Sequence, residues 1–210
     1  LPAEMVNAGE YTITLNAKGK YSGSTTTTFT ITQKPLDASF FVLNGKNPVI
    51  FNGEDQTPGF TLKEGEPIVP ADFTYATTTI VEEAPVAVSE MIDADTYTYT
   101  FTAAETGSNY SGEVTVDFVI NKATAEIVEP ELINRTYNGY DQALVTEGTS
   151  DAVAGTKDEA GAEIEYQIIQ SIDEEDVVLV DWTTDYAEIV QRNAGDYKVN
   201  YKITASEKNY

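Results

Sequence analysis

The chain of 210 residues has no cysteine and no histidine, and its 12 Lys and Arg stand against 35 Asp and Glu. Without these two residue types there is no disulfide, no thiolate or His-bound metal site, and no Ser-His-Asp or Cys-His catalytic group. The net charge of −23 argues against a nucleic-acid partner, because phosphate contacts need clustered Lys and Arg. We therefore expect neither nucleic-acid binding nor triad chemistry.

Long apolar runs are also lacking. No stretch of 18 apolar residues occurs, so we expect no transmembrane helix and no direct membrane insertion. Residues 1–5 have neither an initiator Met nor the basic and apolar regions of a signal peptide, so we expect an excerpt or a processed product. Hydrophobic residues at 41% and aromatic residues at 10% predict a folded chain in spite of the charge.

The dominant pattern is alternation of apolar and polar residues with period two, which is typical of half-buried strands. It occurs at 11–15, 96–102, 114–120 and 197–203. The more ambiguous stretch 161–179 is rich in Ile and Val, which favours strands there too. The alternation predicts an inward position for the following aromatic residues: Tyr11, Tyr97, Tyr99, Phe101, Tyr197 and Tyr201.

Several short motifs recur along the chain in the same order. Asn7-Ala8-Gly9-Glu10-Tyr11 returns as Asp93-Ala94-Asp95-Thr96-Tyr97 and as Asn193-Ala194-Gly195-Asp196-Tyr197, and a second tyrosine follows each copy. Upstream, Phe51-Asn52-Gly53 returns 86 residues later as Tyr137-Asn138-Gly139. Such self-similarity is the sequence signature of a repeat architecture.

The repeats predict three modules. Residues 1–33 form the C-terminal part of a first module, 34–122 a complete module, and 123–210 a module that lacks its last strand. The junctions are short, so neighbouring modules of the same longer chain are expected to lie close together. A strand from a partner is an alternative way to complete the third module. The two later modules carry net charges of −10 and −13, and their mutual repulsion favours an extended array.

The size and strand content of a module predict an immunoglobulin-like β-sandwich. A small residue, a turn and a Tyr that opens a strand are typical of a tyrosine corner, although a plain hairpin turn would also explain them. Two residues after that Tyr, where antibody domains carry a Cys, this chain has Ile13, Tyr99 and Val199, which we expect to point into the core. The predicted class is therefore all-β, with tandem immunoglobulin-like modules.

The order of these motifs resembles the MBG-type bacterial Ig-like repeats, over essentially the whole chain. The matching elements are aromatic-Asn-Gly-x-x-Gln, a Lys/Thr-Glu-Gly turn, Asn-Ala-Gly-x-Tyr, Asn-Tyr-Ser-Gly and Phe-x-Ile. The chain departs from the pattern at Asp93-Ala94-Asp95, which lacks the Gly, and in an acidic insertion in its last module. The resemblance implies a β-sandwich array outside the cell, in a large secreted or surface-attached bacterial protein, and no catalytic residue.

The functional expectation is therefore a structural and adhesive spacer segment of a bacterial cell-surface or secreted protein, extracellular and not an enzyme. Its partners would be a host or cell-surface glycan or protein. Two alternatives stay open: a carbohydrate- or mucin-binding module, and an Ig-like decoration of a phage or an extracellular filament. Tyr140 and Trp182 are the best candidates for an exposed aromatic contact, although Trp182 fits a core position better.

Calcium is the one cofactor for which the sequence offers ligands, because calcium prefers oxygen donors. The densest acidic cluster is Asp173-Glu174-Glu175-Asp176, with Asp181 and Asp185 nearby. Further acids stand at Asp93, Asp95, Glu126, Glu129 and Glu131. No EF-hand loop is present, and a solvated acidic loop that keeps the protein soluble is the favoured explanation of the cluster.

An intramolecular Lys–Asn isopeptide bond is a second stabilising device that the sequence leaves open. Lys34, Lys63 and Lys122 are the possible donors, and Asn121 is the possible acceptor.

Overall fold

A computed structural model describes residues 5–156, 161–172 and 174–210. The chain is all-β, and its described helical segments are 3-10 turns of three residues each: η1 (Ala38–Phe40), η2 (Pro70–Asp72) and η3 (Tyr186–Glu188). No described helix has the length and hydropathy needed to cross a membrane. The chain divides into unit 1 (Leu1–Val49, Gln56–Met91, Asp95–Val119) and unit 2 (Ile50–Asp55, Ile92–Ala94, Ile120–Tyr210).

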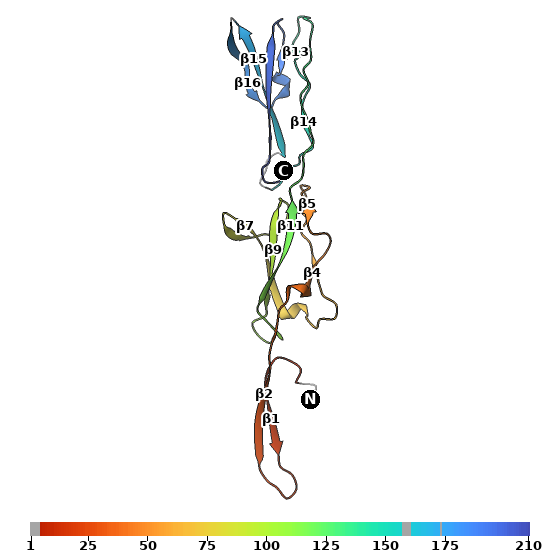
Figure 1. Cartoon of the computed structure of the whole chain (residues 1–210), viewed down its shortest axis with the longest axis vertical. Coiled ribbons are helices and arrows are strands. Elements are labelled where there is room, and N and C mark those ends of the chain that lie inside the picture. Colours follow the sequence, from red (N-terminus) through yellow and green to blue (C-terminus); the bar gives the residue numbers. More distant parts are fainter. Residues whose placement is uncertain (1–4, 157–160, 173) are drawn as a thin grey trace. The chain divides into compact units, whose positions relative to one another are not determined.

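Unit 1 is built on a five-stranded sheet with the order β5-β11-β9-β7-β8, in which β9 and β11 lie side by side (Figure 1). Its strands are β5 (Val49–Ile50), β11 (Glu113–Asn121), β9 (Asp95–Ala103), β7 (Phe73–Val81) and β8 (Ala84–Ala87). Three smaller pairs accompany it: β1 (Gly9–Asn16) with β2 (Ser24–Ile31), β3 (Lys34–Pro35) with β10 (Tyr110–Ser111), and β4 (Phe41–Leu43) with β6 (Phe60–Leu62).

The core of unit 1 is aromatic and lies between the β4–β6 pair and the large sheet. Phe41 of β4 stacks on Phe101 of β9 with ring centroids 3.7 Å apart, and Phe60 of β6 meets Phe101 edge-on at 4.9 Å. Two sheets that face each other through interdigitating side chains are what a β-sandwich requires. Tyr97, Tyr99 and Phe101 are all buried, which confirms the inward face predicted for this strand.

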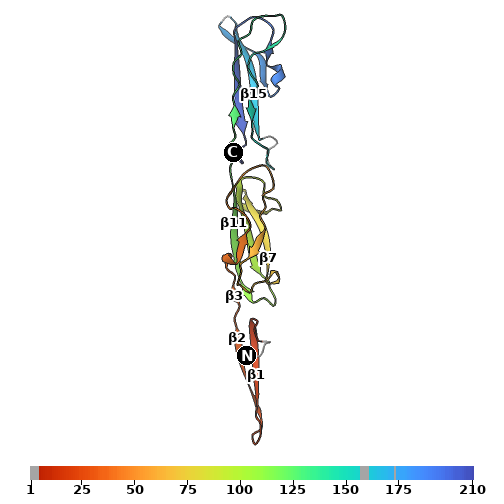
Figure 2. The same ribbon diagram turned by 90° about the vertical axis from the view of Figure 1, so that its right-hand side faces the viewer.

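The β1–β2 hairpin can be followed in Figure 2 and is antiparallel. Tyr11 lies opposite Phe29, and the two rings are stacked with centroids 5.4 Å apart. β1 carries apolar residues at alternate positions, as β9 and β11 do, whereas β2 does so only at Phe29 and Ile31. In the hairpin, however, these side chains are only half-buried or exposed. Ile13, predicted to point into a core, is therefore half-buried, whereas its counterpart Tyr99 is buried.

Unit 2 contains a three-stranded sheet of order β16-β15-β18, with β18 at one edge among the described strands. These strands are β15 (Ala162–Ile172), β16 (Glu175–Thr183) and β18 (Tyr197–Ala205), so the ambiguous stretch after residue 161 forms strands as predicted. Two short pairs complete the unit: β12 (Ile127–Val128) with β14 (Thr149–Ser150), and β13 (Gln142–Ala143) with β17 (Val190–Gln191).

The core of unit 2 is smaller and mainly aliphatic. Its buried members are Val145, Tyr166, Ile168 and Ile189, and Val199 packs against them from β18 as predicted. Tyr201 was predicted to point inward, and this prediction is wrong, because its side chain is 38% exposed. Tyr201 lies opposite the buried Tyr166 on the same sheet, but β18 has no described neighbour on its outer side to cover it.

Candidate functional site

The Asn-Ala-Gly-x-Tyr motif folds in the same way at both ends of the chain. The hydroxyl of Tyr11 donates to the carbonyl of Asn7 at 2.8 Å, and the hydroxyl of Tyr197 donates to the carbonyl of Asn193 at 2.9 Å. A Tyr hydroxyl bonded to the backbone a few residues upstream is the hydrogen bond of a tyrosine corner. The motif therefore forms a corner-like turn rather than a plain hairpin turn at these two positions.

The aromatic-Asn-Gly motif also repeats its local structure. The Asn52 side chain accepts a hydrogen bond from the Glu54 N–H at 3.0 Å, and the Asn138 side chain accepts one from the Tyr140 N–H at 2.9 Å. Gly53 and Gly139 follow with φ of 78° and 80°, a conformation that favours glycine. Each motif is thus an Asx turn of the same hand.

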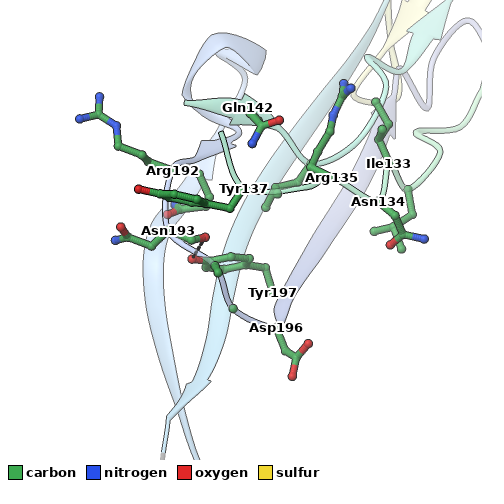
Figure 3. A pocket seen from close by; sticks show the side chains of 14 residues that line it. Ile133, Asn134, Arg135, Tyr137, Gln142, Arg192, Asn193, Asp196 and Tyr197 are labelled. Carbon is green, nitrogen blue, oxygen red and sulfur yellow. Dashed lines mark hydrogen bonds between the residues drawn. The ribbon is translucent and has the colours of Figure 1, made fainter. Parts of the chain in front are cut away.

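In unit 2 the two motifs come together around a cavity of about 480 Å³, which we call the Asn193 pocket. Residues of the 132–137 and 191–197 segments line most of it, with Gln142 and Leu144 from the β13 region. Figure 3 shows the rings of Tyr137 and Tyr197 with the Asn193 side chain beside them. At the rim, Arg192 donates from Nε and Nη2 to the Asp141 carboxylate at 3.2 and 3.0 Å. The pocket therefore offers amide and aromatic groups for contact with a ligand, and the Arg192–Asp141 ion pair lies at its rim.

A second hollow lies on unit 1 and has a different character. Phe60, Phe73 and Tyr75 line it together with Leu62 and Pro70, around a volume of about 550 Å³. Tyr75 is 56% exposed, and its ring meets that of Phe60 edge-on at 5.1 Å. Such an exposed aromatic surface suits stacking against a flat apolar face of a ligand.

Of the four calcium candidates, the three that the structure describes are not part of a metal-binding group. Asp173 lies outside the described residues. Glu174 occupies the turn between β15 and β16 with φ of 67°, while Glu175 and Asp176 begin β16, where Asp176 accepts a hydrogen bond from the Ser171 hydroxyl. Within 5–156, 161–172 and 174–210, no group of three or more acidic side chains is arranged to hold a metal ion.

Three other acidic candidates, Asp95, Asp185 and Glu129, accept hydrogen bonds. Asp95 accepts from the Thr79 hydroxyl at 2.8 Å, and Asp185 accepts from the Ala187 N–H at the start of η3. Glu129 accepts from the Tyr201 hydroxyl at 3.0 Å, and this hydrogen bond raises the pKa of Tyr201 above its ordinary value.

Asp93 differs from these acids because it is buried in unit 2. Its carboxylate accepts from the Thr156 N–H at 2.9 Å, from the Thr156 hydroxyl, and from the Asn209 amide at 3.2 Å. Asn209 is fully buried and also accepts from the Ala94 N–H at 2.7 Å. Gly155 leaves room for this group, since a Cβ there would lie 2.3 Å from both Asn209 and Asp93.

The aromatic candidates are exposed to different degrees. Tyr140 is 74% exposed, in agreement with its predicted surface position. The core position favoured for Trp182 is wrong, because its side chain is 39% exposed and Lys202 lies over its ring at 4.7 Å. A cation over an indole face contributes a modest attraction at an exposed position.

Two of the three lysines considered for an isopeptide bond, Lys34 and Lys122, have other side-chain contacts. Lys34 Nζ lies 2.6 Å from Glu66 Oε2, and this hydrogen bond raises the pKa of Lys34. Lys122 Nζ donates to the carbonyls of Glu207 and Tyr210.

Asn109 and Asn209 each make several hydrogen bonds to distant segments, and the sequence did not predict these contacts. The available signal was that each precedes the second tyrosine of a motif set. Searches of family models, of curated proteins and of solved structures found no match to this chain.

Proposed function

We propose that the chain is a structural and adhesive spacer segment, built from tandem immunoglobulin-like modules, of a bacterial cell-surface or secreted protein. One observation carries the proposal: the recurring motifs fold alike, with a Tyr-to-carbonyl bond at both Asn7 and Asn193. Copies that fold alike suit a stalk, in which each module performs the same mechanical task. The acidic surface supports extension, since successive like-charged modules repel one another.

The stalk proposal predicts an extended particle in solution. A compact chain of this length has a radius of gyration of about 17 Å. We expect small-angle X-ray scattering to give a clearly larger value for residues 1–210. The value should stay large in 1 M salt, where the Debye length is about 3 Å, because short junctions as well as charge keep the modules apart.

A Gly/Ser insertion between Lys122 and Ala123 is the control, since it lengthens the predicted junction and, within unit 2, disturbs the hydrogen bond from the Ala123 N–H to the Asn209 carbonyl. We expect it to broaden the distance distribution of the particle. A wild-type value near 17 Å at either salt concentration would contradict the stalk.

A carbohydrate- or mucin-binding module is the second candidate, favoured by the exposed aromatic hollow of Phe60 and Tyr75. If this reading holds, a glycan array should show saturable binding that Tyr75→Ala, Tyr140→Ala or Trp182→Ala reduces at least tenfold. Val128→Ala, at an exposed aliphatic position, is the matched control and should leave binding unchanged. Binding that survives all three aromatic changes would remove this candidate.

A further inference from the structure

Unit 1 contains a hydrogen-bonded clasp between the turn at Asn7 and the segment at Asn109. Asn109 Oδ1 accepts from the Ala8 N–H at 2.7 Å, and Asn109 Nδ2 donates to Asn7 Oδ1 at 3.1 Å. The Asn109 carbonyl also accepts from the Lys34 N–H at 2.8 Å. Asn109 thus uses both its amide oxygen and its amide nitrogen to hydrogen-bond to a turn that lies 101 residues away in the sequence.

Unit 2 contains the same clasp, made by the next copies of both motifs. Asn209 Oδ1 accepts from the Ala94 N–H at 2.7 Å, and Asn209 Nδ2 donates to Asp93 Oδ1 at 3.2 Å. The Asn209 carbonyl accepts from the Ala123 N–H at 2.8 Å. Three equivalent hydrogen bonds with nearly equal lengths indicate that the Asn-Tyr segment and the Asn/Asp-Ala turn are built to fit one another.

The tyrosine that follows the clasping asparagine adds an aromatic contact in unit 2. The Tyr210 ring meets the Phe51 ring edge-on at 5.6 Å. Phe51 is the aromatic residue of its Asn-Gly motif, and the corresponding residue in the next copy is Tyr137.

The third copy of the Asn/Asp-Ala turn, at Asn193 and Ala194, lines the Asn193 pocket. No described residue lies inside this pocket. Its backbone is already shaped like that of the first turn, with Tyr197 bonded to the Asn193 carbonyl as Tyr11 is to Asn7. Tyr137 stands in the pocket beside Asn193 and is 64% exposed (Figure 3). The pocket therefore has the turn, the amide side chain and the aromatic ring of a clasp.

We infer that the Asn193 pocket is a docking site for the Asn-Tyr hairpin turn of a further repeat of this sequence type. The incoming asparagine accepts from the Ala194 N–H and donates to Asn193 Oδ1, and the following tyrosine packs on Tyr137. The inference extends the proposed repeat architecture to a specific contact, and it does not depend on where the protein is located.

Among the residues that the structure describes, an exposed turn of the corresponding type lies in the β1–β2 hairpin, but it lacks the clasping asparagine. Ala17 N donates to the Gly23 carbonyl at 2.9 Å, as Ala103 N does to the Gly112 carbonyl at 3.0 Å. Between these ends the hairpin has Lys20 before Tyr21, and it is three residues shorter. Two copies of the wild-type chain are therefore not expected to dock on one another.

The test gives the hairpin the missing turn. In the full chain, Lys18-Gly19-Lys20 is replaced with the six residues that stand at 104–109, so that Asn precedes Tyr21. We expect sedimentation velocity to show concentration-dependent association of the grafted chain, while wild type stays monomeric. Asn193→Ala in the grafted chain, or Ala in place of the grafted Asn, should reduce the association at least tenfold.

A second measurement does not depend on how the graft folds. A cyclic peptide of residues 104–112 is titrated into the ¹⁵N-labelled wild-type chain. We expect a saturable shift of the Ala194 amide, with the Ala8 and Ala94 amides unmoved because each already has its asparagine. An Ala194 amide that stays unmoved, or association of the graft that survives Asn193→Ala, would overturn the inference. Neither result would alter the scattering test of the stalk.

Discussion

Replacing Phe101 with alanine is expected to lower the unfolding free energy of unit 1 by about 3–5 kcal/mol, the usual cost of removing a buried Phe side chain. Phe101 is fully buried, stacked on Phe41 at 3.7 Å and met edge-on by Phe60 at 4.9 Å. Alanine would leave a void between the two facing sheets, and neither ring could fill it without losing its own partners. Urea denaturation followed by far-UV circular dichroism measures the loss.

Val42→Ala is the matched control for this change, because Val42 neighbours Phe41 in β4 but is 49% exposed. It should cost far less than Phe101→Ala. Trp182 is the single tryptophan and belongs to unit 2, so its fluorescence follows the unfolding of that unit. An unchanged circular dichroism transition in Phe101→Ala would contradict the aromatic core described for unit 1.

Asn209→Asp is expected to destabilise unit 2 by about 3–5 kcal/mol at pH 7, the range for an uncompensated buried charge. Asn209 Nδ2 lies 3.2 Å from Asp93 Oδ1, and both residues are buried. The substitution replaces a donor with a second carboxylate, so two like charges would share one closed site. Urea titration followed by Trp182 fluorescence is the measurement.

The pH dependence distinguishes charge repulsion from a simple loss of fit. Protonation of either carboxyl restores a donor between residues 93 and 209, so the folded variant binds a proton more tightly than the unfolded chain. The destabilisation should therefore shrink as the pH falls. A penalty that is equally large at pH 7 and pH 4 would indicate a steric cause instead.

Asn109→Asp is the matched comparison for Asn209→Asp. Asn109 makes the same two contacts, but its side chain faces the neutral amide of Asn7. The amide of Asn7 can turn its NH₂ group toward the new carboxylate, which restores a hydrogen bond. Asn109→Asp should therefore cost much less than Asn209→Asp and show little change between pH 4 and pH 7.

Local alternation was sufficient to predict the faces of strands that lie inside a sheet. In β9 the residues Tyr97, Tyr99 and Phe101 are buried as expected, and the Phe41 and Phe60 rings of the β4–β6 pair pack on this face at Phe101. The same pattern failed at Tyr201, since alternation predicts which face a side chain takes but not whether anything covers that face. Trp182 failed for a related reason, with Lys202 rather than a core surface over its ring.

Local sequence patterns could not predict the two clasps, at Asn109 and at Asn209. Each joins residues 101 to 116 positions apart, and their specificity lies in both ends of a side-chain amide rather than in hydrophobicity. The sequence did indicate the parts, since the motifs at Asn7, Asp93 and Asn193 and the later tyrosines were recognised as copies. The sequence could not indicate that the Asn-Tyr motif of one set binds the Asn/Asp-Ala turn of the preceding set, as Asn109 binds the turn at Asn7 and Asn209 the turn at Asp93.

The edge position of β18 bears on how the protein behaves when concentrated. An edge strand presents unpaired N–H and C=O groups, on which a strand from another molecule can add and start a fibre. β18 carries Lys198 and Lys202, two of only 12 basic residues in the chain, and Lys202 pairs with Glu165 at 2.9 Å. Lysines on an edge resist such addition, because an incoming strand would have to displace their hydration. We therefore expect Lys198 and Lys202 to oppose the addition of a strand from another molecule at this edge of the described sheet.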